Sequence, residues 1–490
     1  MSEETGDLIA QRRRKAAELR AGGVEPYRYM YRPTHTAEAI HAQYGAVEVI
    51  EDATEVVVAG RMMTRRLHGK TSFAHLRDAT GDIQMYVRRD NVGEDAYEGF
   101  RRLLDLGDIV GVTGTVFRTR TGEITVEAQS VEIVTKALQT LPEKWHGLTD
   151  VETRYRQRYV DLIANTDVRG TFRKRSQLMQ AIREYLNAAD FLEVETPILQ
   201  PLYGGASARP FTTHHNTLNQ TLYLRVSDEL YLKRLVVGGL ERVYEFCKNF
   251  RNEGMDRSHY PEFTLMEVYQ AYADYSTMMD LVEGMVAHAA KAVNGSTQAT
   301  FQGETLDFTP PWRRITMAEG IADVTGLDVL DMDCSALRQA LDARSAEVDD
   351  HVASWGLLVA ELFDAAVEAT LVQPTIVYDY PIETSPLAKR KRGDARFVER
   401  FEPFVAGMEI GNAYTELNDP DDQRARFEEQ AALREAGDDE AQVLDEDFIR
   451  ALEYGMPPTG GLGVGIDRLA MLLTDSASIR DVILFPQMRS

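Results

Sequence analysis

Two strand-like segments near the middle of the chain carry an arginine, an aromatic ring and carboxylates in alternation. Residues 243–251 bring Arg251 to one face, and residues 261–269 bring Phe263 and Glu267 to one face. We expect the two segments to pair as a hairpin that gathers these side chains. An arginine can bind phosphate oxygens bidentately, and the aromatic ring can carry a purine. By itself, the pattern fits a structural ion pair in a sheet core equally well.

A strip of glycines near the C-terminus favours a nucleotide-binding site over a structural ion pair. Residues 461–466 alternate between apolar residues and a bare face formed by Gly461, Gly463 and Gly465, and Arg468 follows. A ligand can lie directly on such a backbone. The spacing is not the G-x-G-x-x-G of a dinucleotide fold, and no G-x-x-x-x-G-K-[ST] phosphate loop occurs. The strip therefore favours a nucleotide bound on a sheet.

Acidic residues form the third part of the expected site. Glu402 and Glu409 lie on or near a buried strand predicted at 401–410. Buried carboxylates need cations, and oxygen ligands suit Mg²⁺ that bridges nucleotide phosphates. Asn412 and Glu416 follow with a parity that Glu409 does not share, so one face for all three requires a bulge or twist near Gly411.

These segments belong to a mixed region of helices and strands that extends to the C-terminus. Helical patterns fall at 171–189, 228–237, 275–293, 356–370 and 468–473. Strand patterns fall at 221–226, 243–251, 261–270, 374–379, 401–410 and 461–466. Without regular βαβ alternation, they predict an α+β domain with a mostly antiparallel sheet. We expect the acidic stretch 419–447 to be an exposed helical excursion.

The N-terminal part has a different pattern, in which a helix at 7–21 precedes short alternating strands. The strands fall at 55–60, 71–78, 82–88, 108–118 and 123–134, which is typical of an OB-fold barrel. Alternation points Phe73 and Gln84 outward, together with His75, Arg77, Tyr86 and Arg88. Unpaired RNA bases bind to such stacking surfaces, although an ordinary polar sheet face is the alternative.

Composition excludes several classes of protein. Two cysteines rule out a disulfide scaffold and a cysteine-rich zinc site, and no long apolar stretch or signal peptide occurs, so we expect a cytoplasmic protein with no membrane partner. The net charge is −24, but residues 1–150 carry only −3 of it, and nucleic acids respond to local basic patches. The basic runs at 12–15 and 389–392 fit a solvated surface as well as an RNA contact.

Three segments together resemble the motifs of class II aminoacyl-tRNA synthetases. They are residues 171–197 for motif 1, 250–264 for motif 2 and 461–468 for motif 3. The segments at 204–211, 227–233 and 266–275 resemble the lysine-specific branch, and 60–66 resembles its anticodon-binding barrel. In the motif 2 loop, Tyr260 stands where the resemblance leads us to expect asparagine.

The resemblance implies a role for each matching residue. For ATP and its Mg²⁺ it implies Arg251, Glu253, His259, Phe263, Glu402, Glu409, Gly463 and Arg468, with Glu402 and Glu409 as metal ligands and Arg251 and Arg468 as catalytic residues. For lysine it implies Gly205 and Glu229 at the α-amino group, Arg251 and Asn412 at the carboxylate, and Glu267, Tyr269 and Glu416 at the ε-ammonium. For the anticodon it implies Phe73, Gln84 and Glu123.

The resulting prediction is ATP-dependent activation of L-lysine to lysyl-adenylate and transfer to the 3′ end of tRNA(Lys), releasing AMP and pyrophosphate. The expected organisation is a helical extension at 1–53, an OB-fold anticodon-binding domain at 54–141, a linker at 142–152 and a class II catalytic domain at 153–490, in a homodimer. An aspartate or asparagine enzyme is the main rival, but Glu416 and Tyr269 argue against it. A paralogue that transfers lysine to a protein would usually lack the barrel, and a decayed regulatory protein would not keep Arg251 and Arg468.

Overall fold

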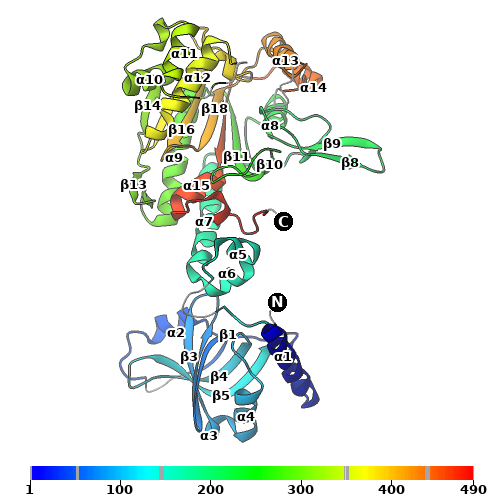
Figure 1. Cartoon of the computed structure of the whole chain (residues 1–490), viewed down its shortest axis with the longest axis vertical. Coiled ribbons are helices and arrows are strands. Elements are labelled where there is room, and N and C mark those ends of the chain that lie inside the picture. The colour runs from blue at the N-terminus through cyan, green and yellow to red at the C-terminus, as the bar shows by residue number, and fades with distance from the viewer. Residues whose placement is uncertain are drawn as a thin grey trace. The chain divides into compact units, whose positions relative to one another are not determined.

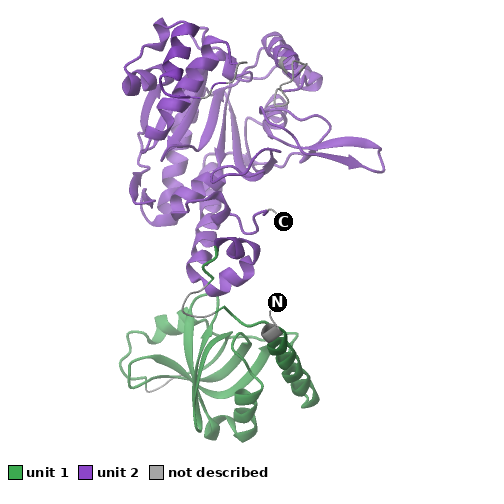
Figure 2. Ribbon diagram, viewed as in Figure 1, with its two compact units in different colours: residues 1–150 green, residues 151–490 purple. Residues whose placement is uncertain are grey.

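The computed structural model describes residues 3–50, 54–142, 148–346, 348, 352–435 and 442–488 (Figure 1). The chain divides into two compact units, Met1–Asp150 and Val151–Ser490 (Figure 2). The finer domain and linker boundaries predicted from the sequence remain predictions. Among the described residues, no helix is long and apolar enough to cross a membrane.

Unit 1 is built around a closed barrel with the strand order β1-β2-β3-β5-β4. Its strands are β1 (Glu55–His68), β2 (Thr71–Arg77), β3 (Asp82–Arg88), β4 (Ile109–Arg118) and β5 (Ile124–Thr135). Its helices are α1 (Glu3–Ala21), α2 (Ala37–Tyr44), α3 (Arg89–Val92) and α4 (Glu94–Arg102). The predicted alternation is confirmed, because Ala74, Leu76, Ile83, Met85 and Val87 are all buried inside the barrel. The sequence patterns did not indicate α2.

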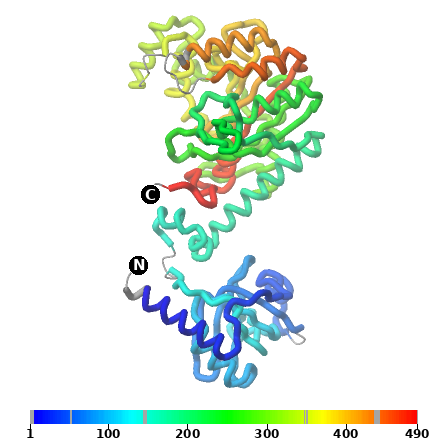
Figure 3. The backbone as a smooth tube through the Cα atoms, turned by 90° about the vertical axis from the view of Figure 1, so that its right-hand side faces the viewer, coloured from blue at the N-terminus to red at the C-terminus, as the bar shows by residue number. Residues whose placement is uncertain are grey.

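The basic run on α1 has a structural use that neither interpretation of the sequence anticipated. Helix α1 lies along the outside of the barrel (Figure 3). Arg12 donates from Nη1 to the carbonyl of Gln139 at 2.7 Å, and Lys15 Nζ lies 2.6 Å from Asp105 Oδ1. Two of the four basic residues at 12–15, Arg12 and Lys15, therefore hold α1 against the rest of unit 1.

Unit 2 contains a large sheet with the strand order β14-β15-β16-β18-β19-β11-β10-β6, in which β17 also pairs with β16. The strands are β6 (Leu192–Glu193), β10 (Arg242–Phe250), β11 (Glu262–Ala271), β14 (Arg313–Thr316), β15 (Thr375–Pro381), β16 (Phe397–Val405), β17 (Met408–Glu409), β18 (Gly411–Thr415) and β19 (Thr459–Gly465). Among the described strand pairs of this sheet, only β14–β15 and β10–β6 are parallel. The predicted α+β class with a mostly antiparallel sheet is confirmed.

Smaller elements complete unit 2. Two small sheets contain β7 (Leu199–Gln200), β8 (Thr212–His215) and β9 (Gln220–Leu224), and β12 (Gln298–Phe301) and β13 (Glu304–Asp307). The helices are α5 (Val151–Arg156), α6 (Arg158–Ala164), α7 (Thr166–Ala188), α8 (Glu229–Val237), α9 (Tyr275–Asn294), α10 (Met317–Thr325), α11 (Cys334–Asp342), α12 (Trp355–Ala366), α13 (Pro420–Glu435), α14 (Glu446–Glu453) and α15 (Ile466–Thr474). Short 3₁₀ turns lie at Val329–Asp331, Glu368–Thr370, Ile382–Thr384 and Ile479–Asp481.

The main core of unit 2 leaves one face of the large sheet available for a site. Helices α7, α9 and α15 pack together beside the sheet (Figure 1). Leu462 and Val464 of β19 are buried in this core, as their parity predicted. The intervening glycines of β19 therefore face the opposite side of the sheet.

The prediction of one continuous strand at 401–410 is wrong, because the chain reverses direction within this segment. Ala406 and Gly407 both have positive φ, +52° and +67°, and they separate β16 from β17. Strand β16 pairs Phe404 with Glu409 of β17 and Phe401 with Ala413 of β18. The two residues on β16 are three positions apart, but their partners are four positions apart, so the partner segment contains one extra residue. This extra residue is the bulge that the parity of the acidic residues required.

Two further expectations need correction. Helix α13 is not simply exposed, since Gln423 and Phe427 are fully buried; residues 436–441 of the acidic stretch lie outside the described residues. The basic run at 389–392 is not a free solvated loop, and the alternative of an RNA contact there stays a prediction. Its four side chains bind Asn418, Asp422, Asp379 and Glu399 of the same unit.

Candidate active site

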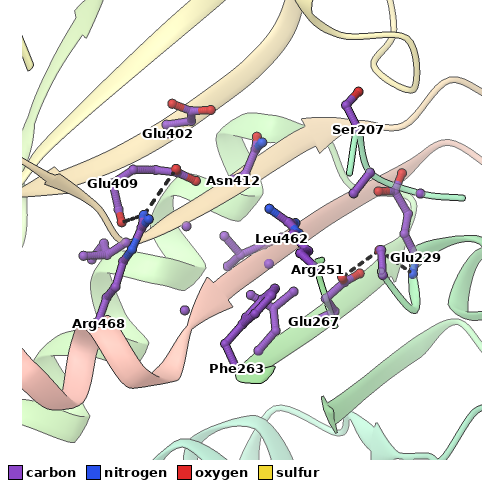
Figure 4. Close-up of a pocket in the computed structure, with 18 of the residues that line it drawn as sticks. Ser207, Glu229, Arg251, Phe263, Glu267, Glu402, Glu409, Asn412, Leu462 and Arg468 are labelled. Atoms are coloured by element: carbon purple, nitrogen blue, oxygen red, sulfur yellow. Dashed lines mark hydrogen bonds and ion pairs between the residues drawn. The ribbon is translucent and has the colours of Figure 1, made fainter. Parts of the chain in front are cut away.

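The open face of the large sheet carries a pocket of about 410 Å³ (Figure 4). It is lined from β11, β16, β17, β18 and β19, from the loop between β10 and β11, and from the starts of α8 and α15. Of the residues predicted from the sequence, it gathers Gly205, Glu229, Arg251, Glu253, His259, Phe263, Glu267, Tyr269, Glu402, Glu409, Asn412, Gly463 and Arg468. Glu416 does not line the pocket and lies just behind this surface.

The predicted hairpin places Arg251 in the middle of the pocket. Strands β10 and β11 pair with Asn249 opposite Phe263, and the Arg251 amide donates to the Pro261 carbonyl at 2.9 Å. The Arg251 guanidinium lies over the Phe263 ring, 5.1 Å from its centroid. Its Nε is buried, and among the described residues it has no hydrogen-bond partner. A cation held by an aromatic ring and lacking an anion is ready to bind an anionic ligand.

One end of the pocket is organised around Arg468. This guanidinium donates from Nη1 to the Glu409 carbonyl at 2.6 Å, and from Nη2 to His259 Nε2 at 3.1 Å. His259 in turn contacts Asp256 through Nδ1 at 2.7 Å. The motif 2 loop is therefore joined to α15 by side chains. Exposed Glu253 lies on the same loop.

Glu402 and Glu409 form a pair of carboxylates beside Arg468. Tyr380 donates to Glu402 Oε2 at 2.8 Å, and Arg400 binds the other oxygen. Burial raises the pKa of Glu402; Arg400 opposes this shift and the Glu409 carboxylate adds to it. No cluster of three His, Cys, Asp or Glu residues in the described part of the chain could hold a metal. Two carboxylates nevertheless fit Mg²⁺, which usually completes its shell with phosphate oxygens and water.

The other end of the pocket is acidic and desolvated. Glu229 and Glu267 are each 5% exposed, and Glu416 is 1% exposed. Tyr269 donates its hydroxyl to Glu267 Oε2 at 2.8 Å, and Ser227 donates to Oε1 at 3.1 Å. Burial raises the pKa of Glu229 and Glu267, and it raises the pKa of Glu416 to about 8. Buried carboxylates in such numbers favour a ligand with positive charge.

Glycines are required here for more than one reason. Gly205 has a φ of +87°, and a Cβ there would meet Ser227 Oγ at 2.9 Å. At Gly461 a Cβ would lie 2.0 Å from Glu416 Oε1, so this glycine makes room for a side chain of the site. At Gly463 and Gly465 a Cβ would make only ordinary contacts, of 3.6 Å or more. Only these two glycines match the bare surface predicted for a ligand.

Several residues of the site escaped the sequence patterns. Arg400 lines the pocket and donates to Asn412 Oδ1 at 3.1 Å; its parity with Glu402 was the available signal. Lys233, one helical turn after Glu229, binds both Glu229 and Glu416. Tyr260 is 8% exposed, and its hydroxyl accepts a hydrogen bond from the Gln487 amide, which explains the departure from asparagine.

The barrel carries a second candidate site. Phe73 and Tyr86 are opposite each other on β2 and β3 and stack with ring centroids 4.6 Å apart. Glu123 accepts from Gln84 Nε2 at 2.7 Å and contacts His75 Nε2 at 2.8 Å. The three predicted residues thus share one face. Phe117, which the sequence reasoning missed, extends the aromatic surface at 5.9 Å from Tyr86.

Comparison with known protein families finds a match for each of the two units. Residues 150–489 match the family "tRNA synthetases class II (D, K and N)", and residues 56–134 match "OB-fold nucleic acid binding domain". The chain therefore belongs to the class II tRNA synthetases, which confirms the resemblance and fold class predicted from its motifs.

Three curated relatives that match nearly the whole chain are lysine–tRNA ligases. The lysine–tRNA ligase of Pelotomaculum thermopropionicum is 54% identical over 99% of this chain and 96% of its own length. The lysine–tRNA ligase of Chloroflexus aurantiacus is 55% identical over 99% of both chains. That of Bacillus subtilis is 52% identical over 99% of this chain and 98% of its own.

Proposed function

We propose that the chain activates L-lysine with ATP and transfers it to the 3′ end of tRNA(Lys). The observation that supports this most strongly is the buried acidic end of the pocket, where Glu229 and Glu267 line the wall beside Tyr269 and Glu416 lies just behind Gly461. Free lysine carries two ammonium groups, one at the α-carbon and one at the end of the side chain. An aspartate or asparagine side chain would instead need a donor where this pocket offers carboxylates.

Arg251 is suited to bring the two anionic reactants together. In adenylate formation, a carboxylate oxygen of lysine bonds to the α-phosphorus of ATP, and the bond from this phosphorus to pyrophosphate breaks. The free guanidinium of Arg251 can contact both the lysine carboxylate and the α-phosphate, and so offsets their repulsion. Asn412, next to Arg400, can donate to the same carboxylate. Little covalent participation of the protein is needed, since positioning lowers the barrier.

The nucleotide has a matching place on the other side of Arg251. Phe263 and Arg468 can hold the adenine between them, and the open backbone at Gly463 and Gly465 lets the nucleotide lie against the sheet. His259 and Glu253 of the motif 2 loop lie at the same end. Glu402 and Glu409 would hold Mg²⁺, which supplies charge neutralisation on the phosphate oxygens when bound.

The lysine side chain would extend towards the acidic end. Gly205 leaves space beside Glu229 for the α-ammonium, and Glu416 with Tyr269 and Glu267 would receive the ε-ammonium. In the second step, a hydroxyl of the terminal ribose of tRNA attacks the lysyl carbonyl and AMP leaves. The barrel face with Phe73, Gln84 and Glu123 would read unpaired anticodon bases by stacking and hydrogen bonding. A homodimer and a cytoplasmic location complete the proposal on the evidence of the sequence.

Amino-acid-dependent ATP–pyrophosphate exchange tests the central claim. Each of the twenty amino acids is supplied in turn, with a reaction lacking amino acid as control. Lysine is expected to support exchange at least about 10³-fold better than aspartate or asparagine, because a buried charge left unpaired is strongly rejected. Exchange with aspartate or asparagine and none with lysine would overturn the assignment.

A further inference from the structure

Lys233 lies directly behind the acidic end of the pocket and is completely buried. It projects from α8 one helical turn after Glu229, and its Nζ lies 2.5 Å from Glu229 Oε1. The same Nζ forms an ion pair with Glu416 Oε2. The ring of Phe448 covers it at 6.0 Å. One internal ammonium thus joins the two carboxylates that the proposed function assigns to opposite ends of lysine.

The surroundings of Lys233 are dominated by acidic groups. The titratable and charged groups that face this centre are Asp228, Glu229, Glu267, Tyr269, Arg400, Tyr414 and Glu416. Burial by itself would lower the pKa of Lys233, but Glu229 and Glu416 outweigh burial and raise it. Lys233 in return opposes the rise in pKa of both carboxylates. The ammonium therefore stays charged and favours their ionised forms.

Lys233 occupies only one oxygen of each carboxylate. Glu416 Oε1 is buried, and among the described residues it has no hydrogen-bond partner. It lies over Gly461, at the wall of the pocket next to Tyr269. Glu229 likewise uses Oε1 for Lys233 and itself lines the pocket. Each carboxylate is thus fixed from behind and keeps an oxygen for a ligand in front.

We propose that Lys233 is a positioning residue for substrate selection: its buried ammonium orients Glu229 and Glu416 and so lets them receive the two ammonium groups of lysine. This inference rests on the proposed function. Lys233 does not line the pocket and acts through the two carboxylates.

A merely structural role predicts a different outcome. Replacing a buried ion pair by apolar side chains of similar volume is often neutral or stabilising for a fold. If Lys233 had only a structural role, Lys233→Met would therefore not weaken the binding of the substrate lysine selectively. A positioning Lys233 would lose affinity for lysine while ATP binding is kept, because ATP binds at the other end of the pocket.

The first experiment compares Lys233→Met with the wild type in ATP–pyrophosphate exchange. The matched control is Lys391→Met, since Lys391 also pairs with a buried carboxylate, Asp379, but outside the pocket. For Lys233→Met, KM for lysine should rise about 30-fold or more, with KM for ATP within about threefold, as expected when a buried charge partner is removed. The pH at which KM for lysine stops falling should move upward by about one unit, since one cation fewer faces the acids. Unchanged KM for lysine and an unchanged pH profile would overturn the inference.

Chemical rescue provides a second, independent measurement. Lys233→Ala removes three methylene groups and the ammonium, which n-propylammonium replaces, and 1-propanol has the same shape without the charge. Propylammonium should restore at least about tenfold in kcat/KM for lysine, and 1-propanol should not, because the charge is the missing element. Equal effects of both, or rescue of the wild type as well, would contradict the proposal.

If Lys233→Met and Lys233→Ala do not fold, Lys233→Arg provides the test of the positioning role. Arginine keeps the charge but cannot occupy the same narrow position, so KM for lysine should rise several-fold while the pH profile stays that of the wild type. Wild-type KM for lysine in this variant would overturn the inference. A wild-type protein without lysine-dependent exchange would refute the proposed function instead, and so the two failures are distinguishable.

Discussion

The two candidate sites of this molecule offer a ligand different kinds of interaction. At the acidic end of the pocket, Glu229, Glu416 and Lys233 are almost completely buried and bound to one another. On the barrel, Phe73 and Tyr86 stack on a half-exposed face. Charges removed from water interact strongly and tolerate little error, whereas stacking in contact with water is modest and tolerant. Substitutions in the pocket should therefore have larger and more selective effects.

The distribution of charge follows the same division. Residues 1–150 have a net charge of −3, and the remainder of the chain carries −21. A unit that binds a polyanion avoids excess negative charge, while a unit that selects a cationic substrate can be acidic. The overall net charge is thus no argument against tRNA binding.

The largest effect should come from Arg251→Met. Removing a preorganised cation between two anions should lower kcat for lysine-dependent exchange by about 10³-fold. The circular dichroism spectrum should not change, because the side chain has no ion pair to lose among the described residues. Exchange within tenfold of the wild type would show that another group holds the reacting anions.

Glu416→Gln should come next, and its effect should be confined to lysine. Losing one partner of a buried charge pair should lower kcat/KM for lysine by about 10²-fold and leave KM for ATP within about threefold. Glu283→Gln is the matched control, since Glu283 of α9 is also buried but pairs with Arg314 of β14. Equal losses for lysine and ATP would remove Glu416 from the ε-ammonium site.

Lysine binding should also depend on pH. Burial raises the pKa of Glu416 to about 8, Lys233 opposes this shift and Glu229 adds to it. Below that pH the free enzyme carries a protonated Glu416, which must lose its proton to bind an ammonium group. KM for lysine should therefore fall as the pH rises from 6 towards 8, by at most about tenfold per unit for one proton. An opposite slope in steady-state exchange would contradict this assignment.

On the barrel, Phe73→Ala should raise KM for tRNA about tenfold, which corresponds to the loss of one stacking contact. Lysine-dependent exchange without tRNA should remain at the wild-type rate. Tyr454→Ala removes an aromatic ring that is 83% exposed outside the barrel and serves as control in the aminoacylation assay. Loss of exchange in Phe73→Ala would break the functional separation of the two sites.

The smallest effect belongs to Tyr260→Phe. Losing the hydrogen bond to the Gln487 amide should lower the free energy of unfolding by about 1 kcal/mol in urea denaturation. Exchange should stay within about twofold, because phenylalanine keeps the ring of this buried residue and removes only its hydroxyl. A rise in KM for ATP of more than fivefold would restore a nucleotide contact at this position.

Much of the fold could be predicted because alternation and helical periodicity are local signals. They located the hairpin of β10 and β11, the glycine strip of β19 and the inward face of the barrel. The turn at Ala406–Gly407 was missed, since apolar residues on both sides of it read as one continuous strand. Arg400 was missed for a different reason, because the predicted strand began one residue after it, whereas β16 begins at Phe397.

The sequence by itself determined the chemical groups of this protein, the order of its motifs and the faces on which alternating residues lie. These depend on the covalent order of the chain and on backbone periodicity. Only the tertiary structure decided which groups meet: His259 with Arg468, Glu123 with Gln84, and Lys233 with Glu416. These pairs are distant in sequence, and sheet order, a bulge and burial bring them together. The physical reason is that a charge acquires its partner and its pKa from its surroundings in space.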